Sequence, residues 1–216
     1  TAPRPIRVPW AMPTRKAHGT LMGLGAVHAT AVGLRPAQVA VFVGAPLVGG
    51  LAFQVPIGWL SDRIPRRGVM VAVAAVAAAA GLLAATADPG SYSSYLWMFV
   101  IGGMSFPLYS LGVAYTNDWL EPDQMLGASA ALVMAVGVGA VLGPLATTAL
   151  TVVFGPSPFY LTLTVVHAVV VGYLLYRIAT NRAPTLAEQG AYVPFPARAS
   201  ATAAQLLQRR RNGRPR

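Results

Sequence analysis

Residues 68–87 contain no charged side chain, and Thr86 is the only polar side chain among them. A helix rises about 1.5 Å per residue, so about 20 apolar residues cross the hydrocarbon core of a membrane, which is about 30 Å thick. A single charge at the centre of such a helix would cost about 2.5 to 3.5 kcal/mol, a large share of the gain from its valines and leucines. This stretch therefore predicts a helix that crosses a lipid bilayer.

Five other stretches have the same character and are separated by turns rich in Pro, Gly and acids. The stretch at 19–33 is the shortest, since it reaches only about 22 Å as a helix, so it must be tilted, extended into the preceding sequence or truncated. The predicted spans are 19–33, 37–58, 68–87, 95–115, 125–150 and 157–177. The predicted fold class is an all-α, polytopic membrane helix bundle.

The distribution of charge supports this fold class and excludes a nucleic-acid partner. Hydrophobic residues make up 55% of the chain and charged residues only 10%, about half the charged share of a soluble protein. The net charge of +10 is concentrated at both ends of the chain and in one loop, whereas a groove for nucleic acid would mix Lys and Arg with aromatic residues along one face. We therefore expect membrane lipid, and no nucleic acid, around this chain.

The cations also predict which way the spans run. With six spans and a cytoplasmic N-terminus, fifteen of the sixteen Lys and Arg residues fall on the cytoplasmic side, and only Arg35 lies outside. Cytoplasmic loops of membrane proteins carry an excess of Lys and Arg. We expect a multi-pass protein of the plasma (inner) membrane with both termini cytoplasmic. Residues 1–18 are expected to form an irregular basic segment, and residues 179–216 a basic, disordered cytoplasmic tail.

The sequence lacks the residue sets that an enzyme or a metal site needs. It contains no cysteine, which excludes disulfides, thiolate metal ligands and a thiol nucleophile. No pair of acids lies within a span, no histidines have metal-ligand spacing, and no Gly-x-Ser-x-Gly elbow occurs. We therefore predict no catalytic residue, no metal and no cofactor. Residues 1–18 contain four prolines and no apolar run, so they do not resemble a signal peptide, and we expect the chain, which begins at Thr1, to be a fragment of a longer one.

A charged loop between the second and third predicted spans carries the most informative motif. Its residues of interest are Gly58, Asp62, Arg63, Arg66 and Arg67. Their spacing resembles the loop signature of the major facilitator superfamily, although Pro65 stands where that family often has Gly. The resemblance implies a gating role, because an acid at a helix end and nearby arginines can make contacts that form only when two halves of a transporter close on this side. The alternative is a loop that has merely collected arginines.

Residues 137–144 in the fifth predicted span form a glycine-rich motif that ends in proline. It comprises Gly137, Gly139, Gly143 and Pro144. Gly139 and Gly143 are four residues apart on one helix face, which allows close helix packing, and Pro144 can bend the helix. The motif resembles the Gly-Pro-terminated motif on the fifth span of a major facilitator half. Close packing without a role in transport would also explain it.

Residues 115–123, between the fourth and fifth predicted spans, are acidic and contain no cation. The acids Asp118, Glu121 and Asp123 precede the next span, and the dipole of a helix favours acids near its start. We therefore interpret them as helix-start residues. A secondary hypothesis is that they pair with Arg66 or Arg67 across the cytoplasmic face.

Two histidines, His28 and His167, place an imidazole within the predicted spans. Ionisable residues in a membrane are functional candidates by default, although a single histidine is more often a packed, hydrogen-bonded residue. The resemblance implies that spans 1, 2, 4 and 5 of a half line the substrate cavity. We therefore rank His28, Gln54 and Tyr109 above His167 as cavity candidates.

The motifs together make residues 19–178 similar to the C-terminal six-helix half of a major facilitator superfamily transporter, most like poorly characterised bacterial members. The resemblance implies transport of a small-molecule substrate by alternating access, with the missing N-terminal half as the partner. Two alternatives stay open. The chain could be a non-transporting membrane protein, either a remnant or an assembly or regulatory subunit, or it could be a first half followed by its basic linker.

The predicted topology can be tested by labelling, because the chain has no native cysteine. In intact cells, a membrane-impermeant maleimide should label a Ser93→Cys variant from outside and a Gly213→Cys variant only after the membrane is opened. The reason is the asymmetric placement of the cations. Labelling of both positions from the same side would contradict the orientation.

Overall fold

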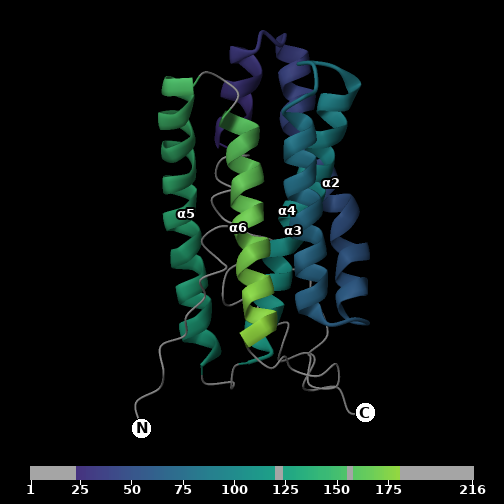
Figure 1. Ribbon diagram of the computed structural model, residues 1–216, viewed down its shortest axis with the longest axis vertical. Helices are drawn as coiled ribbons and strands as arrows, with labels where there is room; N and C mark the ends of the chain where they lie inside the picture. The colour runs from purple at the N-terminus through teal and green to yellow at the C-terminus, as the bar shows by residue number, and fades with distance from the viewer. Residues whose placement is uncertain (1–22, 120–123, 155–157, 181–216) are drawn as a thin grey trace.

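A computed structural model describes residues 23–119, 124–154 and 158–180. All regular structure in these residues is helical, and the helices lie side by side along the long axis of the molecule (Figure 1). A short helix at residues 23–31 precedes five long helices. These are α2 (Pro36–Ser61), α3 (Arg66–Ala84), α4 (Tyr92–Asn117), α5 (Met125–Phe154) and α6 (Pro158–Thr180). The all-α fold class is confirmed.

The five long helices are apolar and long enough to cross a membrane. Each overlaps one predicted span, and most extend a few residues further at one or both ends. The helix at 23–31 lies inside the predicted span 19–33, whose first four residues lie outside the described part of the chain. The predicted basic segment 1–18 also lies outside it. The predicted tail 179–216 is described only at residues 179 and 180, which belong to α6.

Local sequence signals explain the connection between the helix at 23–31 and α2. Gly33 ends the first helix with a φ of 84°, a left-handed conformation that glycine adopts without strain. Helix α2 then begins with Pro36 in its first turn, while the side chain of Gln38 accepts a hydrogen bond from the Arg35 N–H at 3.0 Å. Gln38 thus satisfies one backbone N–H at the helix start, and Pro36 has no N–H that would need a partner there.

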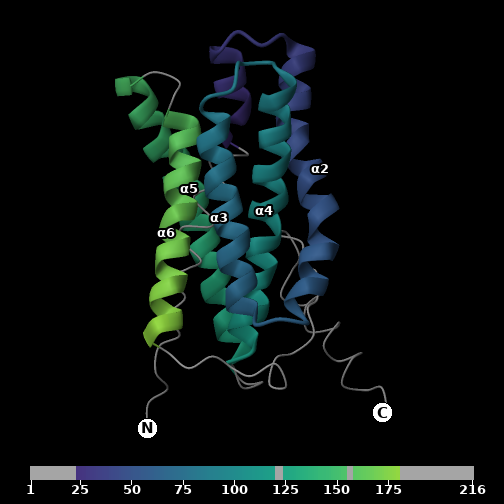
Figure 2. The same ribbon diagram turned by 45° about the vertical axis from the view of Figure 1, so that its right-hand side comes forward.

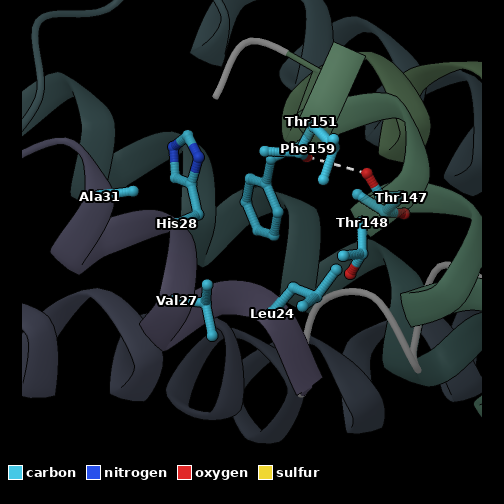
Figure 3. A pocket seen from close by; sticks show the side chains of 9 residues that line it. Leu24, Val27, His28, Ala31, Thr147, Thr148, Thr151 and Phe159 are labelled. Atoms are coloured by element: carbon cyan, nitrogen blue, oxygen red, sulfur yellow. Dashed lines mark hydrogen bonds between the residues drawn. The ribbon is translucent and has the colours of Figure 1, made fainter. Parts of the chain in front are cut away.

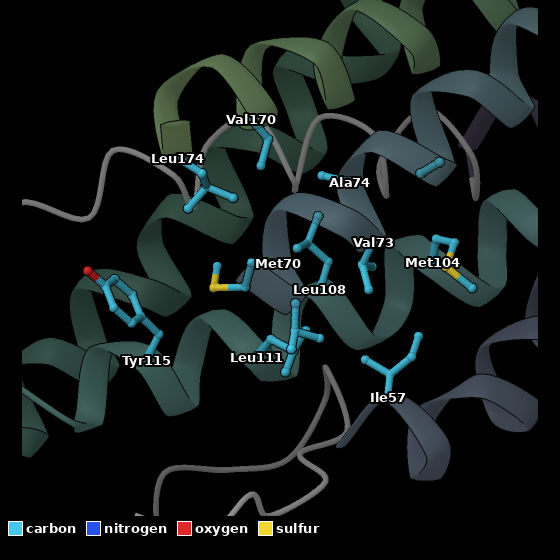
Figure 4. Packing of buried hydrophobic residues seen from close by; sticks show 12 residues of the cluster. Ile57, Met70, Val73, Ala74, Met104, Leu108, Leu111, Tyr115, Val170 and Leu174 are labelled. Atoms are coloured by element: carbon cyan, nitrogen blue, oxygen red, sulfur yellow. The ribbon is translucent and has the colours of Figure 1, made fainter. Parts of the chain in front are cut away.

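Helix α4 lies at the centre of the packing, with α2 on one side and α3 on the other, and α3 in turn packs against α6. Figure 2 shows this order, with α5 and α6 at one side of the bundle and α2 at the other. One core cluster joins four helices around Met70, Leu108 and Leu174 (Figure 4). Helix α3 contributes a fully buried alanine face that includes Ala74, Ala77 and Ala80. Small side chains of this kind let neighbouring helices approach closely.

Helices α2 and α4 approach each other closely where they cross, and two pairs of glycines make this possible. A Cβ atom on Gly102 would collide with the backbone of Pro46, and one on Gly49 would collide with the carbonyl of Phe99. Gly50 and Gly103 likewise face the rings of Phe106 and Phe53. The sequence analysis did not identify these glycines. Each pair is adjacent in the chain and lacks the four-residue spacing that drew attention to the motif at 137–144.

We predict that Gly102→Ala destabilises the bundle, because the added methyl group meets backbone atoms of α2 that cannot rotate away. Overpacking of this kind costs about 1 to 3 kcal/mol or more. The matched control is Gly172→Ala in α6, where a Cβ atom would meet nothing within 4 Å. The measurement is the unfolding free energy of each variant in detergent micelles. Equal stabilities of the two variants would contradict the close crossing.

Candidate functional site

The charged loop places the ends of four helices together at one end of the bundle. Helices α2, α4 and α6 end there and α3 begins there, at the lower end of Figure 1. Among the described residues, four of the five arginines lie at this end and one, Arg35, lies at the other. The residues that the sequence singled out in the loop are therefore gathered in one place.

Arg66 is the centre of this site. Its Nη1 atom donates to both carboxylate oxygens of Asp118, at 2.7 and 2.6 Å, and its Nη2 atom donates to Asp62 at 3.3 Å. The side chains of Arg66 and Asp118 are 1% and 3% exposed, whereas that of Asp62 is 34% exposed. Arg66 is therefore held in a buried ion pair on one side and a looser, partly solvated pair on the other.

Every charge in this arrangement sits at a helix end that would disfavour it in isolation. Asp62 and Asp118 follow the last residues of α2 and α4, where the dipole of a helix repels an anion. Arg66 opens α3, where the dipole repels a cation. The opposite charges compensate one another only when the three helix ends meet. The site is thus a tertiary arrangement that no single helix would form.

Arg67, in the first turn of α3, contacts both α4 and α6 at the same end of the bundle. Its Nε atom donates to the hydroxyl of Tyr115 at 2.8 Å, and its Nη1 atom donates to the carbonyl of Arg177 near the end of α6 at 3.3 Å. Its guanidinium lies 5.3 Å and 5.7 Å from the ring centres of Tyr115 and Trp119. Because the side chain is buried, these contacts fix the ends of α4 and α6 against the start of α3.

Arg63 and Gly58 complete the loop motif in different ways. Arg63 lies 3.4 Å from the ring centre of Trp59 and donates to the Trp59 carbonyl at 3.1 Å, a cation–π arrangement at the rim of the bundle. Gly58 is buried, and its carbonyl accepts a hydrogen bond from the Ser61 hydroxyl at 2.7 Å. Arg63 thus faces outward, while Arg66 and Arg67 face inward.

The structure corrects our interpretation of the acidic segment. Asp118 is not a helix-start residue, since it follows the last residue of α4 and precedes α5 by several residues. It pairs with Arg66, as the secondary hypothesis proposed. The preference for a helix start failed because α4 continues to Asn117, beyond the predicted end of its span. Glu121 and Asp123 lie outside the described residues.

The three cavity candidates do not come together. His28 is half-buried and lines a cavity beside α5 and α6 (Figure 3). Gln54 is half-buried on α2, and Tyr109 is buried on α4, and neither lines that cavity. They stay candidates for a cavity that a second half would complete.

The glycine-rich motif of α5 is divided between a buried and an exposed side of the helix. Gly139 and Gly143 are buried, and Pro144 faces Gly23 of the first helix. Gly137 is exposed, and among the described residues no atom lies within 4 Å of a Cβ placed there. Within the described part of the chain, Gly137 therefore contributes no close helix contact.

His167, which the sequence ranked last, is fully buried between α4 and α6. Its Nδ1 atom lies 2.7 Å from the carbonyl of Leu163 and must donate to it, so Nε2 accepts from the Ser105 hydroxyl at 2.9 Å. This is the packed, hydrogen-bonded histidine that we considered as an alternative.

Comparisons with known proteins give a consistent result. The profile of the family described as Major Facilitator Superfamily matches residues 16–213. The chain is 29% identical over 126 residues to an uncharacterized MFS-type transporter, YfkF, of Bacillus subtilis, covering 58% of this chain and 32% of that protein. It is 25% identical over 166 residues to the uncharacterized MFS-type transporter YE1530 of Yersinia enterocolitica, covering 77% of this chain and 42% of that protein. The chain thus matches less than half the length of these relatives.

Two solved structures are similar in fold. An auto-inhibited POT family peptide transporter superposes with a TM-score of 0.68 and 12% sequence identity, covering 83% of this chain and 38% of that one. The POT family transporter PepTSo superposes with a TM-score of 0.67 and 13% identity, covering 92% of this chain and 40% of that one. At this identity the likeness concerns the arrangement of the helices alone.

We predict that Asp118→Ala strongly destabilises the bundle, because it leaves the guanidinium of Arg66 buried without its main partner. Removing one member of a buried ion pair costs about 3 to 5 kcal/mol. The measurement is the unfolding free energy in detergent micelles, with Asp88→Ala, an exposed acid at the other end, as the control.

A double variant separates the loss of charge balance from the loss of packing. Replacing the pair with apolar residues of similar size, Arg66→Met with Asp118→Leu, should recover most of the stability lost in Asp118→Ala, since no charge is then left buried. A double variant as unstable as the single one would contradict the ion-pair explanation.

Proposed function

The chain belongs to the Major Facilitator Superfamily, and from this premise we propose that it forms the second six-helix half of a secondary transporter that moves a small solute across the membrane by alternating access. The observation that carries the proposal is the charged cluster around Arg66. A cluster of this kind can act as a latch on the side of the membrane where the two halves close.

The different exposure of the two acids supports a latch. Asp118 is held almost without solvent contact against Arg66, whereas about a third of the Asp62 side chain is exposed beside the same guanidinium. The Asp118 pair therefore keeps Arg66 in place, while Asp62 stays within reach of a surface that approaches from outside this bundle. The N-terminus of a helix in the other half would attract this carboxylate through its dipole.

The placement of cations supports a cytoplasmic position for this latch. Arg63, Arg66, Arg67 and Arg177 lie at the end of the bundle that holds the cluster, and Arg35 lies at the other end. Cations mark the cytoplasmic side of a membrane protein. We infer that the cluster faces the cytoplasm in the plasma (inner) membrane. The two halves would then be closed at the cluster when the transporter is in its outward-open state.

The length of the relatives supports a missing partner half. The curated relatives are more than twice as long as the region that matches this chain, and a transporter of this class binds its substrate between two bundles. Gln54 and Tyr109, together with His28, are the polar side chains that we propose to face such a shared cavity. The substrate would be a small molecule that contacts both halves.

The latch predicts a specific effect of Asp62→Asn in a transporter that contains this chain together with an N-terminal half. A transported solute is first identified by screening the uptake of small solutes into membrane vesicles. In the Asp62→Asn variant, uptake of this solute should fall about tenfold, because the variant loses about 1.4 kcal/mol of stabilisation from one conformation only. The amount of protein in the membrane should change little, because Asp62 lies at a helix end and its charge costs little to insert there.

Asp88→Asn at the opposite end is the matched control and should leave uptake unchanged. If the Asp62→Asn variant takes up solute as fast as the wild type, Asp62 is a loop residue without a gating role. Failure of every variant and of the wild type to take up any solute would favour the alternative of a non-transporting membrane protein with the same fold.

A further inference from the structure

Arg63 is the arginine of the loop motif that takes no part in the buried charged cluster. Arg66 and Arg67 are buried and donate inward, to the carboxylate of Asp118 and to the hydroxyl of Tyr115. Arg63 is exposed, and its guanidinium forms no ion pair with an acid of the described residues. The proposed latch therefore leaves the role of this cation unexplained.

The side chain of Arg63 is nevertheless held in a defined position by Trp59. Its Cζ atom lies 3.4 Å from the centre of the Trp59 ring, and its Nη1 atom donates to the Trp59 carbonyl at 3.1 Å. Arginines near a helix end commonly make this bond to a carbonyl. A guanidinium carries five N–H donors in a fixed fork, so most of its donors stay available to an acceptor from outside the described part of the chain.

The surface of α2 that leads to Arg63 is apolar and exposed. Leu51, Val55 and Trp59 follow one another at intervals of four residues, and their side chains are 75%, 69% and 57% exposed. Residues four apart are neighbours on one helix face, and the contact between Trp59 and Arg63 continues this series into the turn after α2. Leucine and valine suit the hydrocarbon of a bilayer, and tryptophan suits the boundary between hydrocarbon and headgroups. Arg63 then lies at the level of the headgroups.

A phosphate group with acyl chains attached matches this series from end to end. Arginine binds phosphate oxygens through parallel N–H bonds, and a phospholipid carries its phosphate just outside the hydrocarbon. An acyl chain below that phosphate would lie against Val55 and Leu51, which gain nothing from contact with water. A soluble phosphate ester would use Arg63 and leave the apolar part of the series without a partner.

The neighbouring acid, Asp62, is engaged elsewhere. Its carboxylate accepts a hydrogen bond from Nη2 of Arg66 at 3.3 Å, whereas Arg63 contacts Trp59. The charge of Arg66 compensates that of Asp62, which weakens the repulsion between this carboxylate and a phosphate bound at Arg63.

We propose that Arg63 and Trp59 form a binding site for the phosphate of a phospholipid, with one acyl chain lying along Val55 and Leu51. Arg63 donates to the phosphate oxygens, and the ring of Trp59 keeps the guanidinium in position for them. The site belongs to the surface of this chain alone. Its test therefore requires neither transport nor a second half.

Tryptophan fluorescence can report whether the site is occupied. The chain in detergent micelles is titrated with phosphatidylglycerol whose acyl chains carry bromine, which quenches a nearby indole. The sequence contains four tryptophans, so the signal of Trp59 is taken as the difference between each protein and the same protein with Trp59→Phe. The mole fraction of lipid that quenches half of this signal measures the affinity.

Arg63→Gln should raise the half-quenching fraction of phosphatidylglycerol about fivefold, the contribution of one arginine near an anionic surface. Brominated diacylglycerol has the same chains without the phosphate, so its half-quenching fraction should be equal in the wild type and in Arg63→Gln. Arg177→Gln is the matched control, because Arg177 lies at the same end of the bundle but on α6, on the other side from α2 (Figure 2). It should leave both fractions unchanged.

Three results would overturn the proposal. Equal half-quenching fractions of phosphatidylglycerol in the wild type and in Arg63→Gln would show that Arg63 does not bind the phosphate. An effect of Arg63→Gln on diacylglycerol of the same size would show that the arginine acts on packing alone. An equal effect of Arg177→Gln would show that the lipid is attracted by the whole charged end and has no site at Arg63.

Glycerol 1-phosphate distinguishes a lipid from a soluble source of phosphate. At the concentration of the lipid it should leave the quenching of Trp59 unchanged, because it lacks the chains that contact Val55 and Leu51. Relief of the quenching would show a site for free phosphate esters and would contradict the assignment to a lipid. Helical circular dichroism equal to that of the wild type establishes that each variant is folded.

Discussion

The guanidinium of Arg66 is buried at the meeting point of three helix ends, and this burial constrains the rest of the bundle. A buried cation is tolerated only when carboxylates accept its hydrogen bonds, and the two that do so come from the ends of α2 and α4. These helices must therefore end at the same depth as α3 begins. Arg67 extends the constraint to α6 through the carbonyl of Arg177. One end of the molecule is thus held together by charge.

Beyond this end, the helices are held by shape. Lipid is as apolar as a leucine side chain, so burying leucine between helices gains little, and close packing decides which helices associate. At the crossing of α2 and α4, Gly49 and Gly102 lie against backbone atoms of the opposite helix, and their neighbouring glycines lie against phenylalanine rings. The helix at 23–31 touches α5 closely at Gly23 and then leaves the cavity lined by His28 and Phe159. The contact between α2 and α4 is therefore closely packed, whereas the contact between the first helix and α5 leaves a cavity beside it.

The charged cluster around Arg66 and the cavity beside Phe159 lie at opposite ends of the bundle and differ in chemistry. The proposed latch is built from ions, which the dipole of an approaching helix can attract or repel. The cavity beside Phe159 is lined mainly by apolar atoms, and among the described residues no charged group lines it. The two can be altered separately, since no residue belongs to both.

The sequence by itself determined that the chain is a bundle of membrane helices with a charged loop containing Asp62 and Arg66, because a charge-free stretch of twenty residues has no better structure than a membrane-spanning helix. Only the tertiary structure decided that Arg66 pairs with Asp118, 52 residues away, and that Gly102 makes a close helix contact while Gly137 makes none with the described residues. The physical reason is that these helices are apolar all round. Their hydrophobic pattern does not distinguish a face toward lipid from a face toward a neighbour, so shape and buried charge choose the partners.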